Sequence, residues 1–355
     1  MSNSACWTPL HAQLHRTLRV RQLLPSQQRL LVAVSGGQDS MSLIKLLLDL
    51  QSKWGWDLAI AHCDHRWRSD SGANADYIEQ LARSWQLSFY RQTAQQIPKS
   101  EADARRWRYQ VLSELALTHH YAYVVTGHTK SDRAETLLYN LIRGSGADGL
   151  QALTWKRPLD PQTDINNNTN NNNDTNNNDT NNNDTNNNIW LVRPLLEILR
   201  SQTGQFCQDQ QLKIWSDSTN EDLNYARNRI RGELIPYLQT HFNPQAEQAL
   251  AQTAELLQAE VDYLEQASEQ LYQQAIAFEP NSTNLKINRL ILRQAPLALQ
   301  RRVMRRWLQE ILPTSPSFEM IEKLTALISA PNRSQTDPFP GGAIARVDGE
   351  WIYTF

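Results

Sequence analysis

The run Leu30-Leu-Val-Ala-Val34-Ser35-Gly36-Gly37-Gln38-Asp39-Ser40 carries the strongest structural signal in this chain. Its apolar first half predicts a buried β-strand, and the apolar residues spaced from Met41 to Leu48 predict a helix directly after it. Two glycines between a strand and a helix let backbone N–H groups converge at the positive end of the helix. The run therefore predicts a loop that binds phosphate.

The form of this loop narrows the kind of phosphate site. No Gly-Lys-Ser/Thr is present, and the glycine spacing is not Gly-x-Gly-x-x-Gly, so Walker A and dinucleotide-binding loops are excluded. The pattern Ser-Gly-Gly-x-Asp-Ser at 35–40 resembles the PP-loop of ATP pyrophosphatases, which cut ATP between its α and β phosphates. That resemblance implies adenylation rather than phosphoryl transfer. The alternative is a turn that needs glycines for structural reasons alone, and six matched positions argue against it.

Length and composition favour a soluble protein with two domains. The chain has 355 residues, 40% of them hydrophobic and 11 of them Trp, which is enough for a substantial core. No apolar run approaches the roughly 20 residues that span a bilayer, and the N-terminus lacks a signal-peptide pattern, so we expect a cytoplasmic protein without membrane contact. Cys6, Cys63 and Cys207 are far apart, which predicts neither a disulfide framework nor a zinc or iron–sulfur site.

The net charge of −2 hides a strong segregation of charge along the chain. Residues 1–38 and 286–306 contain basic residues and no acid, whereas residues 232–285 contain acids and neither Lys nor Arg. Basic blocks of this kind permit a polyanionic partner that is larger than ATP.

Apolar runs alternate with amphipathic segments through the first half of the chain. We expect strands at 57–62, 87–91 and 121–126, and helices at 8–24 (ended by Pro25), 72–85, 101–119 and 132–143. This alternation predicts an α/β fold with a parallel sheet and helices on both faces. Ligands of such sheets bind beyond the carboxyl ends of the strands.

Chemically active side chains follow two of these strands. His62, Asp64 and His65 follow the second strand, and a segment with His128 and the acids Asp132 and Glu135 follows the fourth. Because the two acids are three residues apart on a predicted helix, both carboxylates lie on one side of it. A solvated helix start, where acids interact well with the helix dipole, is the alternative interpretation.

Further motifs run in order along the chain, together with the loop, from about residue 28 to 240. They are Glu101-x-x-Ala-Arg105-x-x-Arg108-Tyr109; Gly127-His128-x-x-x-Asp132-x-Ala-Glu135-Thr136; Arg143-Gly144-Ser145-Gly146 with Gly149-Leu150; Arg193-Pro194-Leu195-Leu196; and Trp215-x-Asp217-x-Thr-Asn220-x-Asp222-x-x-Tyr225-x-Arg227-Asn228-x-Ile230-Arg231. This series resembles the tRNA(Ile)-lysidine synthetase family, in its short form without an extra C-terminal domain. Members convert the wobble cytidine of an isoleucine tRNA into lysidine.

The chain departs from the family pattern at three places. Ser131 stands where the family usually has the first of two acids, Arg133 stands where it usually has Gln, and Arg66-Trp67 replaces the usual Gly-Leu. Of the two adjacent acids that are usual in the family, this chain therefore has only the second, Asp132, and it also has Glu135.

The resemblance and the composition together predict the domain organisation. We expect an N-terminal helix in 1–27, a PP-loop catalytic domain in 28–231, and a mainly helical tRNA-binding domain in 232–355 that ends in a β-hairpin around Asp348-Gly349. The stretch 164–189 is almost entirely Asn, Asp and Thr, which predicts a disordered insertion, with self-association as the alternative. A long amphipathic helix begins near Glu247, and arginines of 286–306 predict a face for RNA phosphates.

The resemblance implies a two-step reaction on the CAU anticodon of tRNA(Ile). ATP adenylates O2 of the wobble cytidine with release of pyrophosphate, and L-lysine then displaces AMP at C2, which changes the codon read from AUG to AUA and the amino acid from Met to Ile. The nucleotide would be held by Ser35, Gly36, Gly37, Gln38, Asp39 and Ser40, with Asp39 binding Mg²⁺ or positioning the α-phosphate.

The second step needs a neutral lysine amine. Because pH 7 lies about 3.4 units below the ordinary pKa of a lysine amine, forming the neutral amine at this pH costs about 4.6 kcal/mol. Asp132 and Glu135 are implied to bind the ammonium and take its proton, and Arg105 or Arg108 to stabilise the α-phosphate. The implied tRNA contacts are Arg143, Arg227, Asn228, Arg229 and Arg231, with structural ion pairs as the alternative role. Whether the enzyme acts as a homodimer stays open.

Other classes of protein share parts of this sequence pattern. Enzymes of tRNA thiolation generally use a pair of cysteines that this chain lacks, and NAD or GMP synthetases share the loop but not the Arg143 and Arg227 motifs. A non-enzymatic sensor of adenine nucleotides would bind ATP without releasing pyrophosphate.

Overall fold

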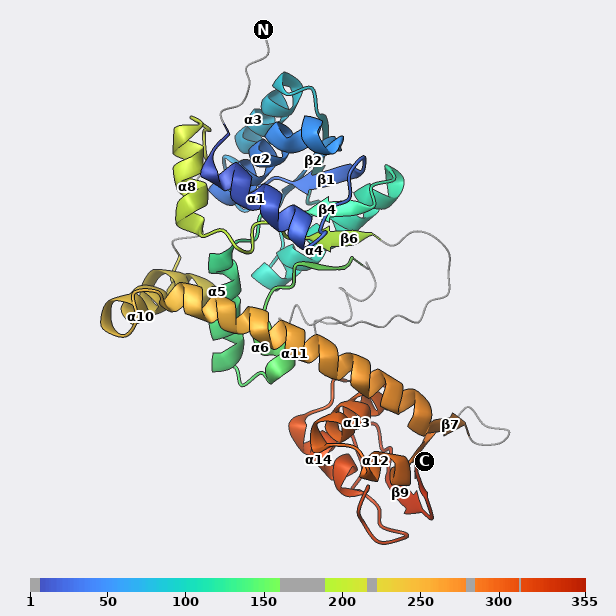
Figure 1. The fold of residues 1–355 in the computed structure, drawn as a ribbon. Helices are drawn as coiled ribbons and strands as arrows, with labels where there is room; N and C mark the ends of the chain where they lie inside the picture. Colours follow the sequence, from blue (N-terminus) through green and yellow to red (C-terminus); the bar gives the residue numbers. More distant parts are fainter. Residues whose placement is uncertain (1–6, 160–188, 216–221, 279–284, 313) are drawn as a thin grey trace. The chain divides into compact units, whose positions relative to one another are not determined.

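The structure, a computed structural model, describes residues 7–159, 189–215, 222–278, 285–312 and 314–355 (Figure 1). The chain forms two compact units, Met1–Leu257 and Gln258–Phe355. The predicted disordered insertion lies outside the described residues except for Ile189, and so do Cys6 and positions 216–221 of the last motif.

The first unit is built on a six-stranded sheet. Its strands run in the order β3 (Ser88–Thr93), β2 (Asp57–Asp64), β1 (Arg29–Ala33), β4 (Tyr123–Val125), β6 (Trp190–Val192) and β5 (Lys156–Pro158). The first five strands are parallel, and β5 is antiparallel to β6. The predicted parallel sheet is confirmed.

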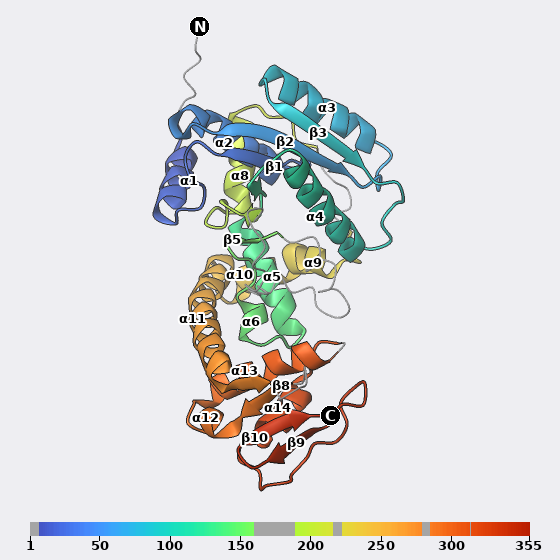
Figure 2. The same cartoon turned by 90° about the vertical axis from the view of Figure 1, so that its right-hand side faces the viewer.

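Helices cover both faces of this sheet because side chains alternate along its strands. Leu30 and Val32 belong to one buried core, whereas Leu31 belongs to another on the opposite face. Figure 2 shows α3 and α4 on opposite sides of the sheet. The helices of the unit are α1 (Pro9–Val20), α2 (Gln38–Trp54), α3 (Ser71–Ser84), α4 (Glu101–Thr118), α5 (Lys130–Ile142), α6 (Ala147–Leu150), α8 (Arg200–Asp209), α9 (Ala226–Arg229), the π-helical turn η2 (Ile230–Leu234), α10 (Ile235–His241) and the start of α11 (Ala246–Ala275).

Several boundaries differ from the sequence predictions. Helix α1 ends at Val20 rather than at Pro25, because Gln22 adopts a left-handed backbone conformation with φ of 50°. The short strands β5 and β6 and helix α8 were not predicted, since three-residue strands carry almost no periodic signal.

From β1 the chain adds β2 and β3 on one side of the sheet and then β4 and β6 on the other side, so β1 lies between β2 and β4. The loops that follow β1 and β4 meet at this point. A Cβ atom on Gly127 would lie 3.0 Å from the backbone of Asp39 and Ser40, so only a glycine lets the β4 loop approach the start of α2 this closely. In a doubly wound sheet such a change of side marks the ligand site.

The second unit contains a four-stranded antiparallel sheet in the order β7 (Ile276–Phe278), β8 (Leu285–Asn288), β10 (Trp351–Thr354) and β9 (Ala345–Asp348). The expected hairpin around Asp348-Gly349 is present as β9 and β10. One face of the sheet packs on a core formed with α12 (Arg289–Arg293), α13 (Leu297–Ile311) and α14 (Phe318–Ala326). None of the described helices of either unit combines the length and apolar content that a membrane span requires.

The arginines of α13 are already paired with glutamates of the second unit. Arg301 donates to both oxygens of Glu322 at 2.6 and 2.9 Å. Arg302 and Arg305 contact Glu265, and Arg306 contacts Glu269, so the positive charge of these arginines is partly neutralised within the unit, and their contact with RNA phosphates stays a prediction.

Candidate active site

The loop between β1 and α2 is held in one shape by hydrogen bonds. Gly36 has a φ of +93°, and a Cβ there would lie 2.3 Å from Oδ1 of Asn74, so this position requires glycine. The Asn74 amide donates to the Ser35 carbonyl at 2.9 Å, and the Ser40 hydroxyl donates to the Gly37 carbonyl at 2.9 Å. The loop is therefore held in this shape by hydrogen bonds within the chain itself.

Helix α2 presents its positive end to this loop. Its N-cap is Gly37, which has no side chain to cover the first N–H groups of the helix. Those groups and the helix dipole favour an anion. The glycine turn and the helix start predicted from the sequence are thus present at Ser35–Ser40, and phosphate binding there stays a prediction.

Helix α8, which sequence reasoning missed, holds two residues of the loop. The Gln38 amide donates to the Arg200 carbonyl at 2.7 Å, and the buried Thr203 hydroxyl donates to Oδ1 of Asp39 at 2.5 Å. Gly204 leaves room for the Gln38 side chain, since a Cβ there would lie 3.4 Å from it. No local pattern could have indicated these contacts, because they join residues about 160 positions apart in the chain.

Asp39 lies in an acidic environment. Burial raises its pKa above the ordinary value, and the negative charge of Asp132 acts in the same direction. The Arg200 guanidinium, 3.6 Å from Oδ2, and the Thr203 hydrogen bond oppose that rise. A cation that binds between Asp39 and Asp132 would relieve their repulsion.

Asp132 forms a capping box at the start of α5. Its Oδ2 accepts from the Thr129 backbone N–H at 2.7 Å and from the Thr129 hydroxyl at 2.8 Å. Burial opposes ionisation of Asp132, but the charges of His128 and Arg231 and the Thr129 hydrogen bonds outweigh it and hold its pKa below the ordinary value. The carboxylate is therefore both a helix cap and a charged group of the site.

Glu135 lies one turn further along α5 and is almost fully buried. Arg231 donates to its two oxygens at 2.6 and 2.8 Å and lies 3.5 Å from Oδ1 of Asp132. Burial raises the pKa of Glu135 to about 6 in spite of this ion pair. Arg231 thus bridges the two acids, which is the structural ion-pair role that the sequence offered as the alternative to a tRNA contact.

A cavity of about 410 Å³ opens over the loop. Most of the predicted nucleotide-binding residues line it, together with Asp132, Asn228 and Arg231. Its remaining lining comes from the ends of β1, β2 and β4, from the segment after β2, from α3, α4 and α8, and from Trp215 and Tyr225. Gly36, Arg105, Glu135, Arg143, Arg227 and Arg229 do not line it.

Of the two arginines considered for the α-phosphate, Arg108 lines the cavity and Arg105 does not. Arg105 instead lies against the ring of Tyr109, with its guanidinium carbon 4.9 Å from the ring centre. Because both are on α4, the sequence motif could not distinguish them.

The predicted tRNA contacts occupy different environments. Arg143 and Arg227 lie on the ring of Tyr139, 5.3 and 6.0 Å from its centre, and Arg227 is 3.5 Å from Glu101. Arg229 donates to the Leu223 carbonyl at 2.7 Å, and the Asn228 amide donates to the Asp222 carbonyl at 2.9 Å. Their contact with tRNA stays a prediction.

His62 and His65 line the cavity where β2 ends. The ring of His62 hydrogen bonds through Nδ1 to the Val34 carbonyl at 2.8 Å, and burial lowers its pKa. Burial also lowers the pKa of His65 to about 3, helped by the positive charge of Arg108. Both rings are therefore neutral near pH 7 and add no charge to the acidic part of the site.

The structure accounts for two of the departures from the family pattern. The Ser131 hydroxyl accepts from the Arg200 N–H at 3.1 Å and so caps the start of α8. The buried Arg133 side chain forms an ion pair with Glu255 of α11, which also accepts from the Trp155 indole at 2.9 Å and from Arg21 at 2.7 Å.

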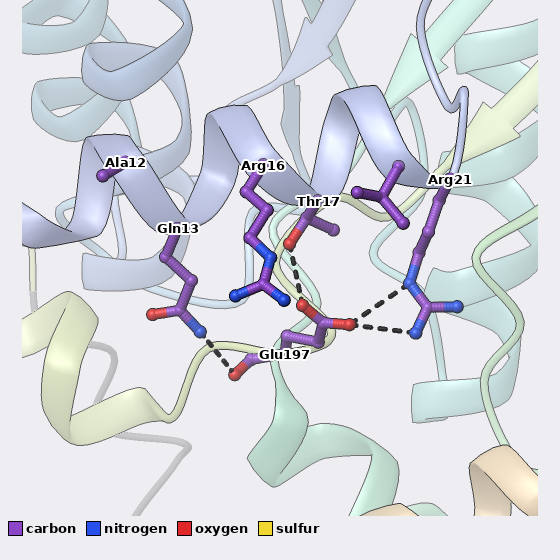
Figure 3. Close-up of a pocket in the computed structure, with 7 residues that line it drawn as sticks. Ala12, Gln13, Arg16, Thr17, Arg21 and Glu197 are labelled. Carbon is purple, nitrogen blue, oxygen red and sulfur yellow. Dashed lines mark hydrogen bonds and ion pairs between the residues drawn. The ribbon is translucent and has the colours of Figure 1, made fainter.

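A second hollow of about 510 Å³ lies along α1, away from the loop (Figure 3). Its carboxylate, Glu197, already accepts from Thr17 at 2.8 Å and from Arg21 at 2.9 Å. Figure 3 shows Arg16 extending from α1 between Gln13 and the hydrogen-bonded pair of Thr17 and Glu197. Because Glu197 already forms hydrogen bonds with Thr17 and Arg21, this hollow is a weaker candidate for the active site than the loop cavity.

The donor set of the loop cavity fits Mg²⁺ only in combination with phosphate. In the parts of the chain that the structure describes, no three His, Cys, Asp or Glu side chains gather as a metal site. Mg²⁺ commonly binds through one or two carboxylates, substrate phosphates and water. Asp39 and Asp132, which repel each other beside the phosphate loop, supply that number of carboxylates.

The loop, placed between β1 and α2 at the carboxyl edge of this sheet, defines a PP-loop protein, and residues 10–238 match the family model described as PP-loop domain. Residues 290–351 match a second model, described as TilS substrate binding domain. A tRNA(Ile)-lysidine synthase from Nostoc sp. strain PCC 7120 is 63% identical over 98% of this chain and 96% of its own, and one from Synechocystis sp. strain PCC 6803 is 50% identical over 98% and 97%. The chain belongs to the tRNA(Ile)-lysidine synthase family.

The protein is therefore an enzyme, a ligase of the PP-loop family, whose domains support ATP and tRNA as its partners. Among solved structures, the U34-tRNA thiolase NcsA from Methanococcus maripaludis is similar, with a TM-score of 0.52 and 12% identity over 70% of this chain and 78% of that one. At this identity the similarity concerns the fold alone.

Proposed function

We propose that this enzyme joins L-lysine to C2 of the wobble cytidine in the CAU anticodon of tRNA(Ile), through an adenylated cytidine. The observation that carries the proposal is the single cavity that holds both a phosphate loop, Ser35–Ser40, and the acids needed for an amine, Asp132 with Glu135 behind it. Family membership supports the same reaction.

In the first step, the chain's task is to hold ATP while O2 of cytosine attacks the α-phosphate. Backbone N–H groups of the loop and the start of α2 would bind the departing pyrophosphate. Arg108, at the wall of the cavity, would stabilise charge on the α-phosphate. Asp39, with Asp132 nearby, would hold Mg²⁺, which neutralises phosphate charge when bound.

The first step makes the second one possible. Oxide is a poor leaving group from C2, whereas AMP leaves readily, so adenylation converts the carbonyl oxygen into a group that an amine can displace. Pyrophosphate and AMP are the expected products in addition to the modified tRNA.

In the second step, the acids bind the lysine ammonium and take its proton. Asp132 is ionised and lines the cavity, so it meets the ammonium first. Glu135, with its pKa raised to about 6, is the stronger base, and because it lies behind Asp132 it would receive the proton by way of Asp132. Arg231 fixes the separation of the two carboxylates by bridging them. The product would read AUA instead of AUG and accept Ile instead of Met.

Incorporation of labelled lysine into a tRNA(Ile) transcript with a CAU anticodon tests the proposal. We expect ATP-dependent labelling with release of AMP and pyrophosphate, and none of a CAU-containing tRNA(Met). Asp39→Asn should lower the rate by about a hundredfold or more, whereas Asp209→Asn, on the exposed end of α8, should not. ATP binding without any labelling would contradict the proposal and favour a nucleotide sensor.

A further inference from the structure

The four-stranded sheet of the second unit has a distinctive face. Lys286 of β8 and Arg346 of β9 both lie directly opposite Tyr353 of the central strand β10. This places a cation, an aromatic ring and a second cation in one row across three strands.

The strand period puts this row on the side of the sheet away from the core. The neighbouring residues Ile287, Ile352 and Val347 pair in the adjacent row and are fully buried against α13 and α14. Successive side chains point to opposite faces of a sheet, so the row of Tyr353 points outward. Its members are partly exposed.

Further aromatic side chains extend the row along the sheet. Trp351 precedes Tyr353 by two positions on β10, and the Lys286 ammonium lies 4.5 Å from the centre of its ring. Phe355 follows by two positions, 60% exposed, with its ring centre 6.1 Å from that of Tyr353. We name Lys286, Arg346, Trp351, Tyr353 and Phe355 the outer sheet face.

The cations of the outer sheet face are distinct from those of α13. The α13 arginines are neutralised by Glu265, Glu269 and Glu322, whereas within the described part of the chain neither Lys286 nor Arg346 forms an ion pair. The acid Asp348 lies on the same side of the sheet, opposite Trp351 and two positions from Arg346, so the row through Tyr353 itself carries the two cations.

We propose that the outer sheet face binds a single-stranded segment of the tRNA substrate, with an unpaired base stacked on an aromatic ring and phosphates at Lys286 and Arg346. Exposed aromatic residues on a sheet, flanked by cations, suit unpaired bases, which offer a free ring face and adjacent phosphates. An RNA duplex keeps its bases stacked internally and offers no such face. This inference rests on the proposed function for the identity of the RNA.

Two substitutions with a matched control test the inference in the full-length enzyme. Tyr353→Thr retains a good strand former, and we expect it to weaken tRNA binding by about tenfold. Lys286→Gln should lower the slope of log affinity against log salt by about one. Lys323→Gln, the same change on the exposed side of α14, should alter neither quantity. Affinity for ATP should stay unchanged in all three.

Competition by other RNAs and a variant that keeps the aromatic ring test the inference further. Tyr353→Phe keeps the ring and should restore binding, which separates stacking from a loss of folded protein. An unstructured oligonucleotide should displace tRNA from this face better than a duplex of equal length. Equal competition by the duplex, or binding by Tyr353→Thr and Lys286→Gln that equals binding by Lys323→Gln, overturns the inference.

Failure of the proposed reaction can be distinguished from failure of this inference. A wild-type enzyme that binds tRNA through this face but incorporates no lysine contradicts the reaction and leaves the RNA-binding face supported.

Discussion

Arg231 donates to both carboxylate oxygens of Glu135, at 2.6 and 2.8 Å, and approaches Asp132 to 3.5 Å. The arginine belongs to the π-helical turn η2, whereas both acids are on α5. The separation of the two acids from each other is therefore maintained by a residue that follows them by almost a hundred positions. An irregular turn of this type often accompanies a functional site.

The three charges should behave as one energetic unit. We expect Arg231→Met to lower the free energy of unfolding by about 3 kcal/mol, because it leaves Glu135 buried and unpaired. Glu135→Gln should be costly as well, and the double variant should lose less than the sum of the two. Urea unfolding of the four proteins measures the coupling, and strictly additive losses would show that the pair is energetically independent.

Glu135 should make stability depend on pH in a defined window. Its pKa rises from 4.5 to about 6 on folding, so between these values the folded state binds more protons than the unfolded state. Stability from this group is therefore lost as pH rises through that window, by about 2 kcal/mol in total. Asp132 does not interfere, since its lowered pKa acts below 3.8.

Thermal unfolding of the wild type and Glu135→Gln between pH 4 and 7 measures this effect. The variant should lack the decline, and the difference between the two curves should change most near pH 5 to 6. Parallel curves would mean that the environment of Glu135 does not shift its pKa.

Thr203 should act on the reaction through Asp39. Its hydroxyl donates to Oδ1 of Asp39 and thereby lowers the pKa of that carboxyl. Thr203→Val removes the donor at nearly constant volume, so the pH at which pyrophosphate release becomes half-maximal should move upward. Thr203→Ser, which keeps the hydroxyl, should restore the wild-type profile. A slower Thr203→Val enzyme with an unmoved pH profile would indicate a merely structural role.

Arg133 should contribute stability rather than chemistry. It pairs with Glu255, and Arg133→Gln should cost about 1.5–3 kcal/mol, because a hydrogen bond to a charged group is lost while Arg21 and Trp155 still hold the glutamate. Calorimetry should show a lower melting temperature with KM values for ATP and lysine unchanged. Raised KM values at unchanged stability would contradict this assignment.

Local sequence patterns predicted much of the fold and of the phosphate site. The run Leu30–Ser40 specifies a strand, a glycine turn and a helix start within a few residues, and the structure has all three there. The alternation of strands and helices likewise follows from apolar periodicity, which is local. For the same reason Asp132 could be placed at the start of a helix from the sequence alone.

The contacts that complete the site could not be predicted in this way. Thr203 reaches Asp39, and Arg231 reaches Glu135, only because tertiary packing joins distant segments. The sequence predicted an arginine face in 286–306, but it could not show that arginines of α13 contact Glu265 and Glu269 of α11, more than thirty positions away in the chain. Side-chain charge is visible in a sequence, whereas its neutralisation is not.

The pairing of β5 with β6 brings Leu159 and Ile189 together, with the Leu159 N–H donating to the Ile189 carbonyl at 2.8 Å. The two described ends of the chain on either side of residues 160–188 are therefore joined by a hydrogen bond. Asp39 on α2, before this gap, and Thr203 on α8, after it, are joined by a direct hydrogen bond between the two helices. We therefore expect the Thr203–Asp39 hydrogen bond to persist in a variant whose sequence between Leu159 and Ile189 is shortened.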